Sequence, residues 1–164
     1  MAQTQIGHEA LTSNNSSALH TPGEMIEIVD SEGLKRYQYV EYESGSAPIV
    51  AAADNIAYYL DGTDWDGYTV TSDLSDTKAN LVAGVLMAAI TDEYYGWVQT
   101  YGYSEDVATN GDDDIAAGDA IIPVADGTVD SVAAGTAPTY KVIGWAVAND
   151  VDADDTVATH LTIM

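Results

Sequence analysis

The sequence contains no cysteine, and only four of its 164 residues are Lys or Arg. Without cysteine, neither disulfides nor a thiolate metal site can hold the fold, so packing and backbone hydrogen bonds must do so. The four cations stand against 27 Asp and Glu residues, which gives a net charge of −23. Because nucleic-acid binding depends on cations that neutralise phosphates, this composition argues against a nucleic-acid partner. It also makes copies of the chain repel one another unless a specific interface overcomes the repulsion.

Targeting and membrane signals are missing as well. The first residues, Met1 to Gln5, lack the basic and apolar regions of a secretory signal. The longest apolar run, Leu81 to Ile90, is far shorter than the roughly 20 residues that a membrane-spanning helix needs. We therefore expect a soluble protein without an export signal or a membrane partner.

Most of the chain is expected to fold despite its charge. Its hydrophobic content is 46%, and it contains 11 Tyr and 3 Trp, a composition that disordered chains do not have. Residues 1–23 are the exception, because they are rich in Gln, Thr, Ser and Asn and show no helix or strand period. We predict an extended arm over residues 1–23 and a folded domain over residues 24–164.

The last two thirds of the chain read as two copies of one β-unit. An apolar segment that ends in Asp-Gly-Thr occurs twice, and so does a strand centred on glycine, at Gly84 and at Gly144. Each glycine-centred strand is followed by an acidic turn and a further strand. This self-similarity predicts internal repeats at about 50–103 and about 114–164.

A β-hairpin is predicted before the first repeat. Residues 24–43 read as two strands joined by a turn at residues 30–33. In the second strand Tyr37 and Tyr39 share one face, while Val40 lies on the other. Since both faces carry bulky side chains, we expect this strand to be covered on both sides.

The segment at residues 75–90 is compatible with either a helix or a strand. Ser75-Asp76-Thr77 resembles a helix start, and the Ala, Leu and Met residues that follow are good helix formers. Its counterpart at residues 142–147 is β-branched and aromatic, and duplicated segments should share a conformation, so we predict a strand. With further strands at residues 94–102 and 156–163, the fold class is all-β: a β-sandwich or barrel of duplicated units behind an extended N-terminal arm.

Acidic loops are the candidates for a cation site. They lie at residues 61–66, 112–114 and 150–155, and Ca²⁺ prefers several oxygens from one loop. The last loop has Asp155 where an EF-hand requires glycine and Leu161 where it requires glutamate. We therefore interpret these loops as solvated turns and expect no metal or other cofactor, with Ca²⁺ binding as the open alternative.

Catalytic groups do not converge in the sequence. Hydrolysis needs a nucleophile, a base and an orienting group held together, yet His8 and His20 lie in the arm and His160 lies in the last strand. No pair of carboxylates has distinct surroundings, as a glycosidase requires, and no glycine-rich loop leads from a strand into a helix. We predict that the protein is not an enzyme.

Aromatic residues point instead to interfaces. Trp65 lies in an acidic turn, where it would stack on a sugar or a partner protein, whereas Trp97 and Trp145 lie in strands and are expected in the core or in an interface. Tyrosines on both faces of a strand are typical of subunit interfaces. The subunit-interface candidates are Tyr94, Tyr95, Trp97 and Tyr101.

Four segments of the sequence resemble those of a known class of proteins. They are "AGDAIIPVADGTV", "YKVIGWAVAND", "TVATHLTI" and "VAGVLMAAITDEYYGWVQTYG". Over residues 24–164 it resembles the capsid decoration, or cement, proteins of tailed bacteriophages. The resemblance implies a small β-barrel or sandwich that oligomerises, often as a homotrimer, on the outside of the virion shell. Its partners would be the major capsid protein and other copies of itself.

Capsid contacts are predicted for the arm and for the only adjacent cations. Ile6, Leu11 and Leu19 would lie along the capsid, where the arm would add hydrogen bonds to an exposed strand edge. Lys35 and Arg36 would meet an acidic patch. Deletion of residues 1–23 is accordingly expected to abolish particle binding and to leave the fold intact.

Two other classes remain open from the sequence. A head-fibre or tail component would share the β fold but bind the particle in few copies. A carbohydrate-binding or Ca²⁺-binding β module would use Trp65 and the loop at residues 61–66.

Overall fold

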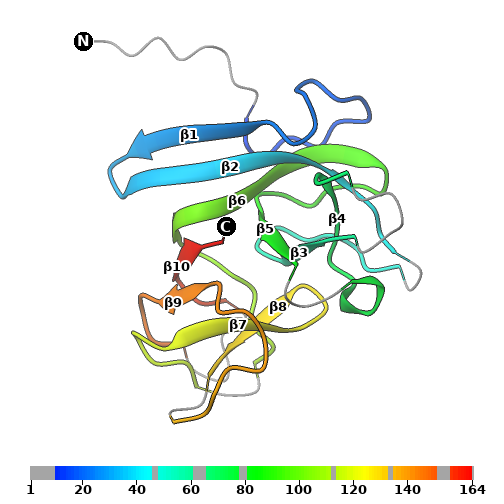
Figure 1. The fold of residues 1–164 in the computed structure, drawn as a ribbon. Helices are drawn as coiled ribbons and strands as arrows, with labels where there is room; N and C mark the ends of the chain where they lie inside the picture. Colours follow the sequence, from blue (N-terminus) through cyan, green and yellow to red (C-terminus); the bar gives the residue numbers. More distant parts are fainter. Residues whose placement is uncertain are drawn as a thin grey trace.

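A single continuous sheet organises the protein in the computed structural model, which describes residues 10–45, 48–60, 66–77, 81–111, 114–132, 135–150 and 156–163. The fold is all-β, as the sequence predicts, with one short 3₁₀ turn, η1 (Leu74–Asp76), in this part of the chain. The strands are β1 (Met25–Asp30), β2 (Gly33–Tyr42), β3 (Ile56–Tyr59), β4 (Thr69–Thr71), β5 (Val82–Leu86), β6 (Tyr94–Ser104), β7 (Ala120–Ala125), β8 (Thr128–Ser131), β9 (Gly144–Ala146) and β10 (Thr159–Thr162). Their order in the sheet is β1-β2-β4-β3-β5-β6-β10-β9-β7-β8 (Figure 1).

Part of the sheet closes on itself to form a barrel. The extra pairing of β2 with β6 completes a cycle through β2, β4, β3, β5 and β6, in which only β2 and β4 run parallel. Each of these strands contributes buried side chains to one cluster. Its members are Val40, Tyr42, Ala51, Ala57, Val70, Ala83, Leu86, Ile90 and Val98. This cluster fills the barrel.

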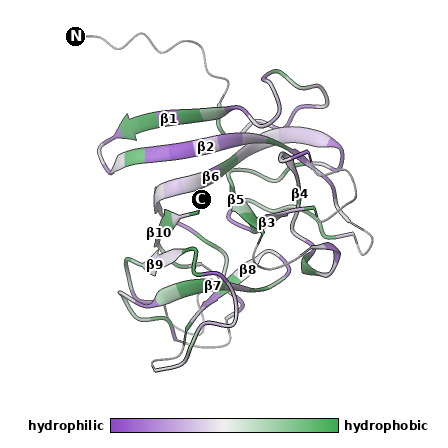
Figure 2. Ribbon diagram, in the orientation of Figure 1, coloured by the Kyte–Doolittle hydropathy of each residue, from purple (hydrophilic) through white to green (hydrophobic). Residues whose placement is uncertain are grey.

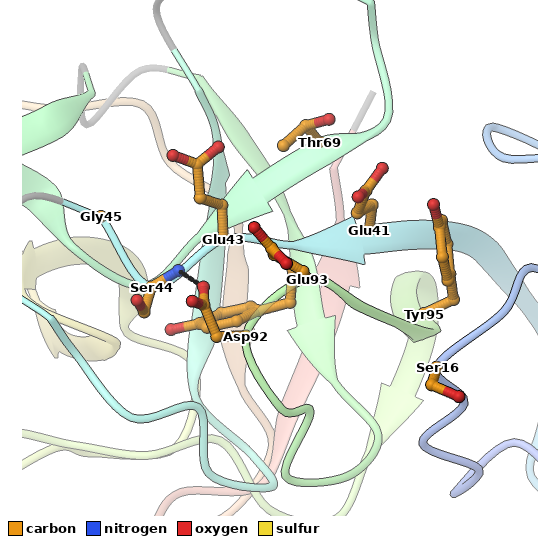
Figure 3. Close-up of a pocket in the computed structure, with 10 residues that line it drawn as sticks. Ser16, Glu41, Glu43, Ser44, Gly45, Thr69, Asp92, Glu93 and Tyr95 are labelled. Carbon is orange, nitrogen blue, oxygen red and sulfur yellow. Dashed lines mark hydrogen bonds between the residues drawn. The ribbon is translucent and has the colours of Figure 1, made fainter.

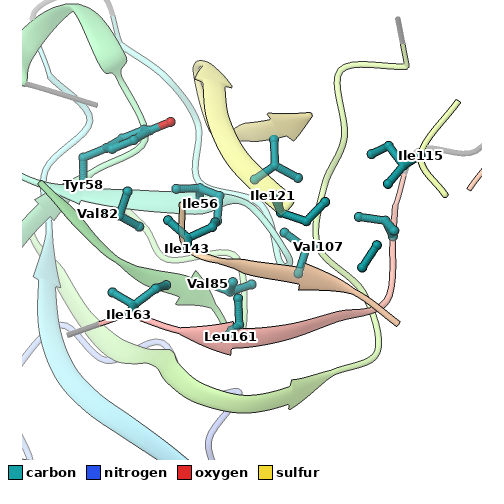
Figure 4. Close-up of a cluster of buried hydrophobic side chains, with 13 residues drawn as sticks. Ile56, Tyr58, Val82, Val85, Val107, Ile115, Ile121, Ile143, Leu161 and Ile163 are labelled. Atoms are coloured by element: carbon teal, nitrogen blue, oxygen red, sulfur yellow. The ribbon is translucent and has the colours of Figure 1, made fainter. Parts of the chain in front are cut away.

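The remaining strands extend the sheet beyond the barrel. β10 pairs with the last part of β6, from Tyr101 to Ser104, and β9, β7 and β8 follow. A second apolar cluster lies between these strands and the outside of β3 and β5 (Figure 4). It combines Ile56, Tyr58, Val82 and Val85 with Val107, Ile115, Ile121, Val129, Ile143, Ala146, Val157, Leu161 and Ile163. Both regions therefore share one core.

The two regions follow the same order of strand pairings. We call β3, β4, β5 and β6 the first unit and β7, β8, β9 and β10 the second unit; β3-β5-β6 in one corresponds to β7-β9-β10 in the other. The register agrees as well, since Val85 pairs with Ile56 and Gln99, and Trp145 pairs with Ala120 and His160. Such agreement is what a duplicated unit predicts, and the duplication itself stays a prediction.

The turn that precedes each unit has the same hydrogen bonds. The backbone N–H of Ala52 donates to the Asn55 side chain at 3.0 Å, and that of Ala116 donates to the Asp119 side chain at 3.0 Å. Between them lies a residue in the left-handed region, Asp54 with φ 71° in the first turn and Gly118 with φ 95° in the second. Only the second turn has the residue type that this backbone favours.

The predicted hairpin is confirmed as β1 and β2, with a two-residue turn between Asp30 and Gly33. β2 is covered on both faces, because Val40 and Tyr42 point into the barrel while Tyr37 and Tyr39 belong to a third cluster with Ile26 and Trp97. The expectation from alternating bulky residues is therefore correct.

Residues 10–23, which we call the N-terminal segment, pack on the domain, whereas the sequence predicts an extended arm there. Leu11 packs on the third cluster, and Asn15 forms an isolated bridge with Tyr95. The backbone N–H of Leu19 donates to the Tyr39 hydroxyl at 3.2 Å, and that of Gly23 donates to the Tyr39 carbonyl at 2.8 Å. This segment covers the outer face of the barrel, so its deletion is not expected to leave the fold intact.

Within the described part of residues 75–90, a strand forms where the counterpart argument places one. β5 spans Val82–Leu86. The residues that resemble a helix start form the short turn η1, and the Asp73 side chain caps it by accepting a hydrogen bond from the Ser75 N–H at 2.8 Å. The final strand is shorter than predicted, because β10 begins at Thr159. Val157 and Ile163 on either side of it are nevertheless buried, as their alternation indicates.

Candidate functional site

The two described histidines, His20 and His160, lie in separate aromatic clusters. His160 stacks on Trp145, and the ring of His20 lies 5.0 Å from that of Trp97, while His8 is outside the described residues. Within the described ranges no three His, Cys, Asp or Glu side chains are placed to hold a metal ion together. The same part of the chain has no helix long and apolar enough to cross a membrane.

A hollow at one end of the barrel is lined by carboxylates (Figure 3). Glu41 and Glu43 come from the end of β2 and its extension, and Asp92 and Glu93 precede β6. Asp92 accepts a hydrogen bond from the Ser44 N–H at 2.8 Å. Burial, together with the neighbouring Glu41, raises the pKa of Tyr95. The hollow concentrates negative charge and favours no anionic ligand.

The acidic loops proposed for Ca²⁺ fall largely outside the described residues, at 61–65, 112–113 and 151–155. Trp65 lies there too, so its predicted stacking role is not addressed. Asp66 is described, and its carboxylate accepts from the N–H groups of Tyr68 at 2.9 Å and Thr69 at 2.8 Å. Partial burial opposes ionisation, but these bonds outweigh it and lower the pKa of Asp66. This carboxylate holds a turn.

The two strands at the ends of the sheet differ in their free edges. The outer edge of β8 is covered, since Val129 donates to the Ala108 carbonyl at 2.9 Å and accepts from the Asn110 N–H at 3.2 Å. Among the described residues, β1 pairs with β2 alone. Large apolar side chains stand exposed on β1, with Met25 58% and Val29 70% accessible. Figure 2 shows this hydrophobic edge strand beside a more polar β2. An apolar open edge is a template for a partner strand.

The arm residues predicted to touch the capsid have different positions. Leu11 is partly buried against the third cluster, whereas Leu19 is 60% accessible on the N-terminal segment. Ile6 lies outside the described residues. Only Leu19 of this set is an exposed apolar side chain in the described structure.

Lys35 and Arg36 are held by the chain's own groups. The ammonium of Lys35 forms ion pairs with Glu32 and, at 3.2 Å, with Asp30, and lies 5.7 Å from the ring centre of Tyr103. The guanidinium of Arg36 bonds to Glu27 at 2.7 Å. Their contact with an acidic patch on a partner stays a prediction.

A row of contacting side chains crosses five neighbouring strands on one face of the sheet. Arg36 lies between Glu27 and the ring of Tyr101, with 5.3 Å from the guanidinium carbon to the ring centre. The Tyr101 ring meets the edge of His160 at 5.6 Å, and His160 stacks on Trp145 at 4.6 Å with an interplanar angle of 2°. We call these five residues, on β1, β2, β6, β10 and β9, the cross-strand row. In Figure 1 these strands lie one below the other.

The remaining interface candidates lie on the barrel. Trp97 is only 1% accessible and packs with Tyr39 in the third cluster, so it is a core residue and cannot present itself to another subunit. Tyr94 packs partly against the barrel core, and Tyr95 stacks near Tyr39 at 6.1 Å. Of the four candidates, the structure brings only Tyr101 into the cross-strand row.

Sequence reasoning missed the exposure of Trp145. Its strand surroundings predicted a position in the core or in an interface, and the indole, which is 45% accessible, does not lie in the core. One sequence signal was available: residues 131–149 contain no Asp or Glu, the longest such stretch in a chain of charge −23. Charge-depleted, aromatic surface is characteristic of interface centres.

No protein-family model matches this chain, and no curated protein matches it at a significant level.

Proposed function

We propose that this chain is a structural virion protein that binds the outer surface of a tailed-phage head and stabilises the capsid lattice as a decoration, or cement, protein. The proposal begins with the resemblance of residues 24–164 to that class. The observation that carries it further is the open edge of β1, which exposes Met25 and Val29 on an otherwise strongly acidic molecule.

The geometry of β1 suits strand addition. Its turn is closed by the pair Asp30 and Gly33, so alternate residues, Val29 and Glu27 among them, direct their backbone groups away from β2. A strand of the major capsid protein would hydrogen-bond to these groups and cover the exposed side chains. Leu19 would extend the apolar contact along the N-terminal segment.

Charge and copy number support the outer surface of the shell as the location. A net charge of −23 suits a position away from packaged DNA phosphate. A protein that binds only the assembled lattice stabilises it by mass action, and many copies on one particle add avidity to modest single contacts. Catalysis has no part in this function.

The test is co-sedimentation of the purified protein with bare capsids, with bound copies counted. Saturation at hundreds of copies per particle is expected, whereas binding to a single vertex or to the tail would identify a fibre or tail component. No binding to capsids would overturn the proposal.

A matched pair of variants locates the contact. Val29→Pro removes an outward N–H and blocks strand addition, while Val29→Thr keeps the N–H and the β-branched shape. We expect Val29→Pro to reduce occupancy at least about tenfold and Val29→Thr to reduce it about twofold. Equal occupancy of the two variants would exclude the β1 edge as the contact.

A further inference from the structure

Corresponding faces of the two units are covered differently. In the first unit, Leu86 points into the barrel and Val85 packs on the second unit, so both sides of β5 are buried. In the second unit, Ala146 packs in the shared core, but Trp145, which corresponds to Val85, is exposed. The described residues therefore leave this face of β9 open at Trp145.

This uncovered face is built as a firm surface. Trp145 rests flat on His160, His160 meets Tyr101, and Tyr101 carries Arg36 on its ring. Each side chain limits the rotamers of the next, so little conformational entropy remains to be lost on binding. Val142 and Val147 stand exposed on either side of Trp145 in sequence. Trp, Tyr and Arg are the residue types that dominate binding energy at interfaces.

The charge pattern identifies the occupant. Two chains of charge −23 repel each other and meet closely most readily where the surface carries little unpaired negative charge. The segment that carries Trp145, residues 131–149, is the longest stretch without Asp or Glu. The row has a single carboxylate, that of Glu27, and Arg36 pairs with it, so little unpaired negative charge opposes the approach of a second copy through the row.

The row is also self-complementary. An exposed cation, Arg36, whose side chain is 42% accessible, lies towards one end, and the exposed indole of Trp145 lies at the other. They are separated by three strand spacings, or about 14 Å, with Tyr101 and His160 between them. A two-fold axis through the middle of the row places each arginine on the tryptophan of the opposite copy, as a cation–π pair.

We propose that the cross-strand row forms an isologous dimer interface, in which Arg36 of each copy stacks on Trp145 of the other. This interface lies on one face of the sheet and reaches β1 only at Glu27, and it does not depend on capsid binding.

Sedimentation equilibrium of the full chain over a range of concentrations tests the proposal. A monomer–dimer equilibrium is expected, and Trp145→Ala should raise the dimer Kd at least about 30-fold. Val50→Ala is the control, because Val50 is exposed but lies outside the row. Since both side chains are exposed, the folded state of each variant should persist, and circular dichroism will verify this.

A mixing experiment tests the two-fold geometry. Arg36→Glu alone places glutamate against the indole, and Trp145→Lys alone places lysine against Arg36, so each variant should be monomeric. When mixed, the two variants form one native Arg36–Trp145 contact and one Glu–Lys contact, and a heterodimer should appear. A monomer at all concentrations, a trimer, a dimer unaffected by Trp145→Ala, or a mixture that stays monomeric would each overturn the proposal.

Discussion

The two units of the sheet have matching strand pairings but different surroundings. The first unit closes into a barrel with β2 and is covered on its other side by the second unit, so both of its faces are buried. The second unit ends in short strands, and the described residues cover only one of its faces. Equivalent positions thus meet different environments, and Val85 and Trp145 show the result most clearly. The same order of strand pairings in two units therefore does not determine whether equivalent positions are buried.

The strongest test of this comparison concerns the core that joins the units. Leu161 is fully buried between them, and Leu86 is fully buried inside the barrel. We expect Leu161→Ala and Leu86→Ala each to lower the free energy of unfolding by about 3 kcal/mol. Because the core is shared, urea unfolding followed by fluorescence and by circular dichroism should give one transition for both variants. Two separate transitions for Leu161→Ala would show that the units fold independently.

The equivalent pair Val85 and Trp145 separates burial from pairing order. Val85→Ala empties space in the shared core and should lower the free energy of unfolding by about 2 kcal/mol. Trp145→Ala removes a larger side chain, yet at monomeric concentrations it should cost less than about 1 kcal/mol because the indole is exposed. Thermal unfolding of the dilute proteins measures both. A larger loss for Trp145→Ala would mean that its face is covered within the chain.

The turns that open the units differ in charge as well as in backbone preference. Burial, with the nearby Asp106 carboxylate, raises the pKa of Asp54, so its charged form disfavours the folded state. Asp54→Asn keeps a residue that tolerates positive φ and should stabilise the protein by about 0.5 kcal/mol at pH 7, after allowance for solvent screening.

The sign of the pH dependence follows from the raised pKa. The gain from Asp54→Asn should be complete above the folded-state pKa of Asp54 and should vanish as pH falls below the unfolded-state value, where the wild-type side chain is protonated too. Chemical denaturation at several pH values measures it, with Gly118→Asn as the counterpart that should destabilise. A gain that grows as pH falls would contradict this account.

The smallest effect is expected at the ion pair of Arg36. Arg36→Gln breaks an exposed contact with Glu27 and should change the free energy of unfolding of the monomer by less than about 0.5 kcal/mol. Self-association should weaken at the same time, and added salt should strengthen the wild-type dimer by screening the repulsion between chains. Thermal unfolding and sedimentation at two salt concentrations provide the measurements. A stability loss above 1 kcal/mol would assign Arg36 to the fold instead.

Local patterns anticipated much of the sheet. Alternation around Tyr37 and Val40 predicted a strand buried on both faces, and β-branched residues near Val142 favoured a strand at Val82–Leu86 over a helix. These patterns succeed because side chains alternate across a strand with a period of two, which depends on neighbouring residues only. The polar composition of residues 10–23 misled for the same reason, since nothing local shows that Leu11 and His20 pack on the third cluster.

The candidate surfaces were foreseen less well. Arg36 and Tyr101 were each singled out, but for separate roles, and Trp97 was assigned to an interface although it lies in the core. Their true positions depend on the pairing of β2 with β6 and of β6 with β10, which joins residues far apart in the chain. The periodic pattern of side chains within one segment does not indicate which distant strand will pair with it.

By itself, the sequence determined the charge of −23, the all-β class and the alternation of buried side chains, because composition and nearest-neighbour geometry suffice for these. Only the tertiary structure decided that β2 closes a barrel with β6, that the N-terminal segment covers it, that β1 keeps an open edge and that Trp145 stays exposed. These outcomes depend on long-range strand pairing, where the burial of one residue is set by whichever distant strand reaches it.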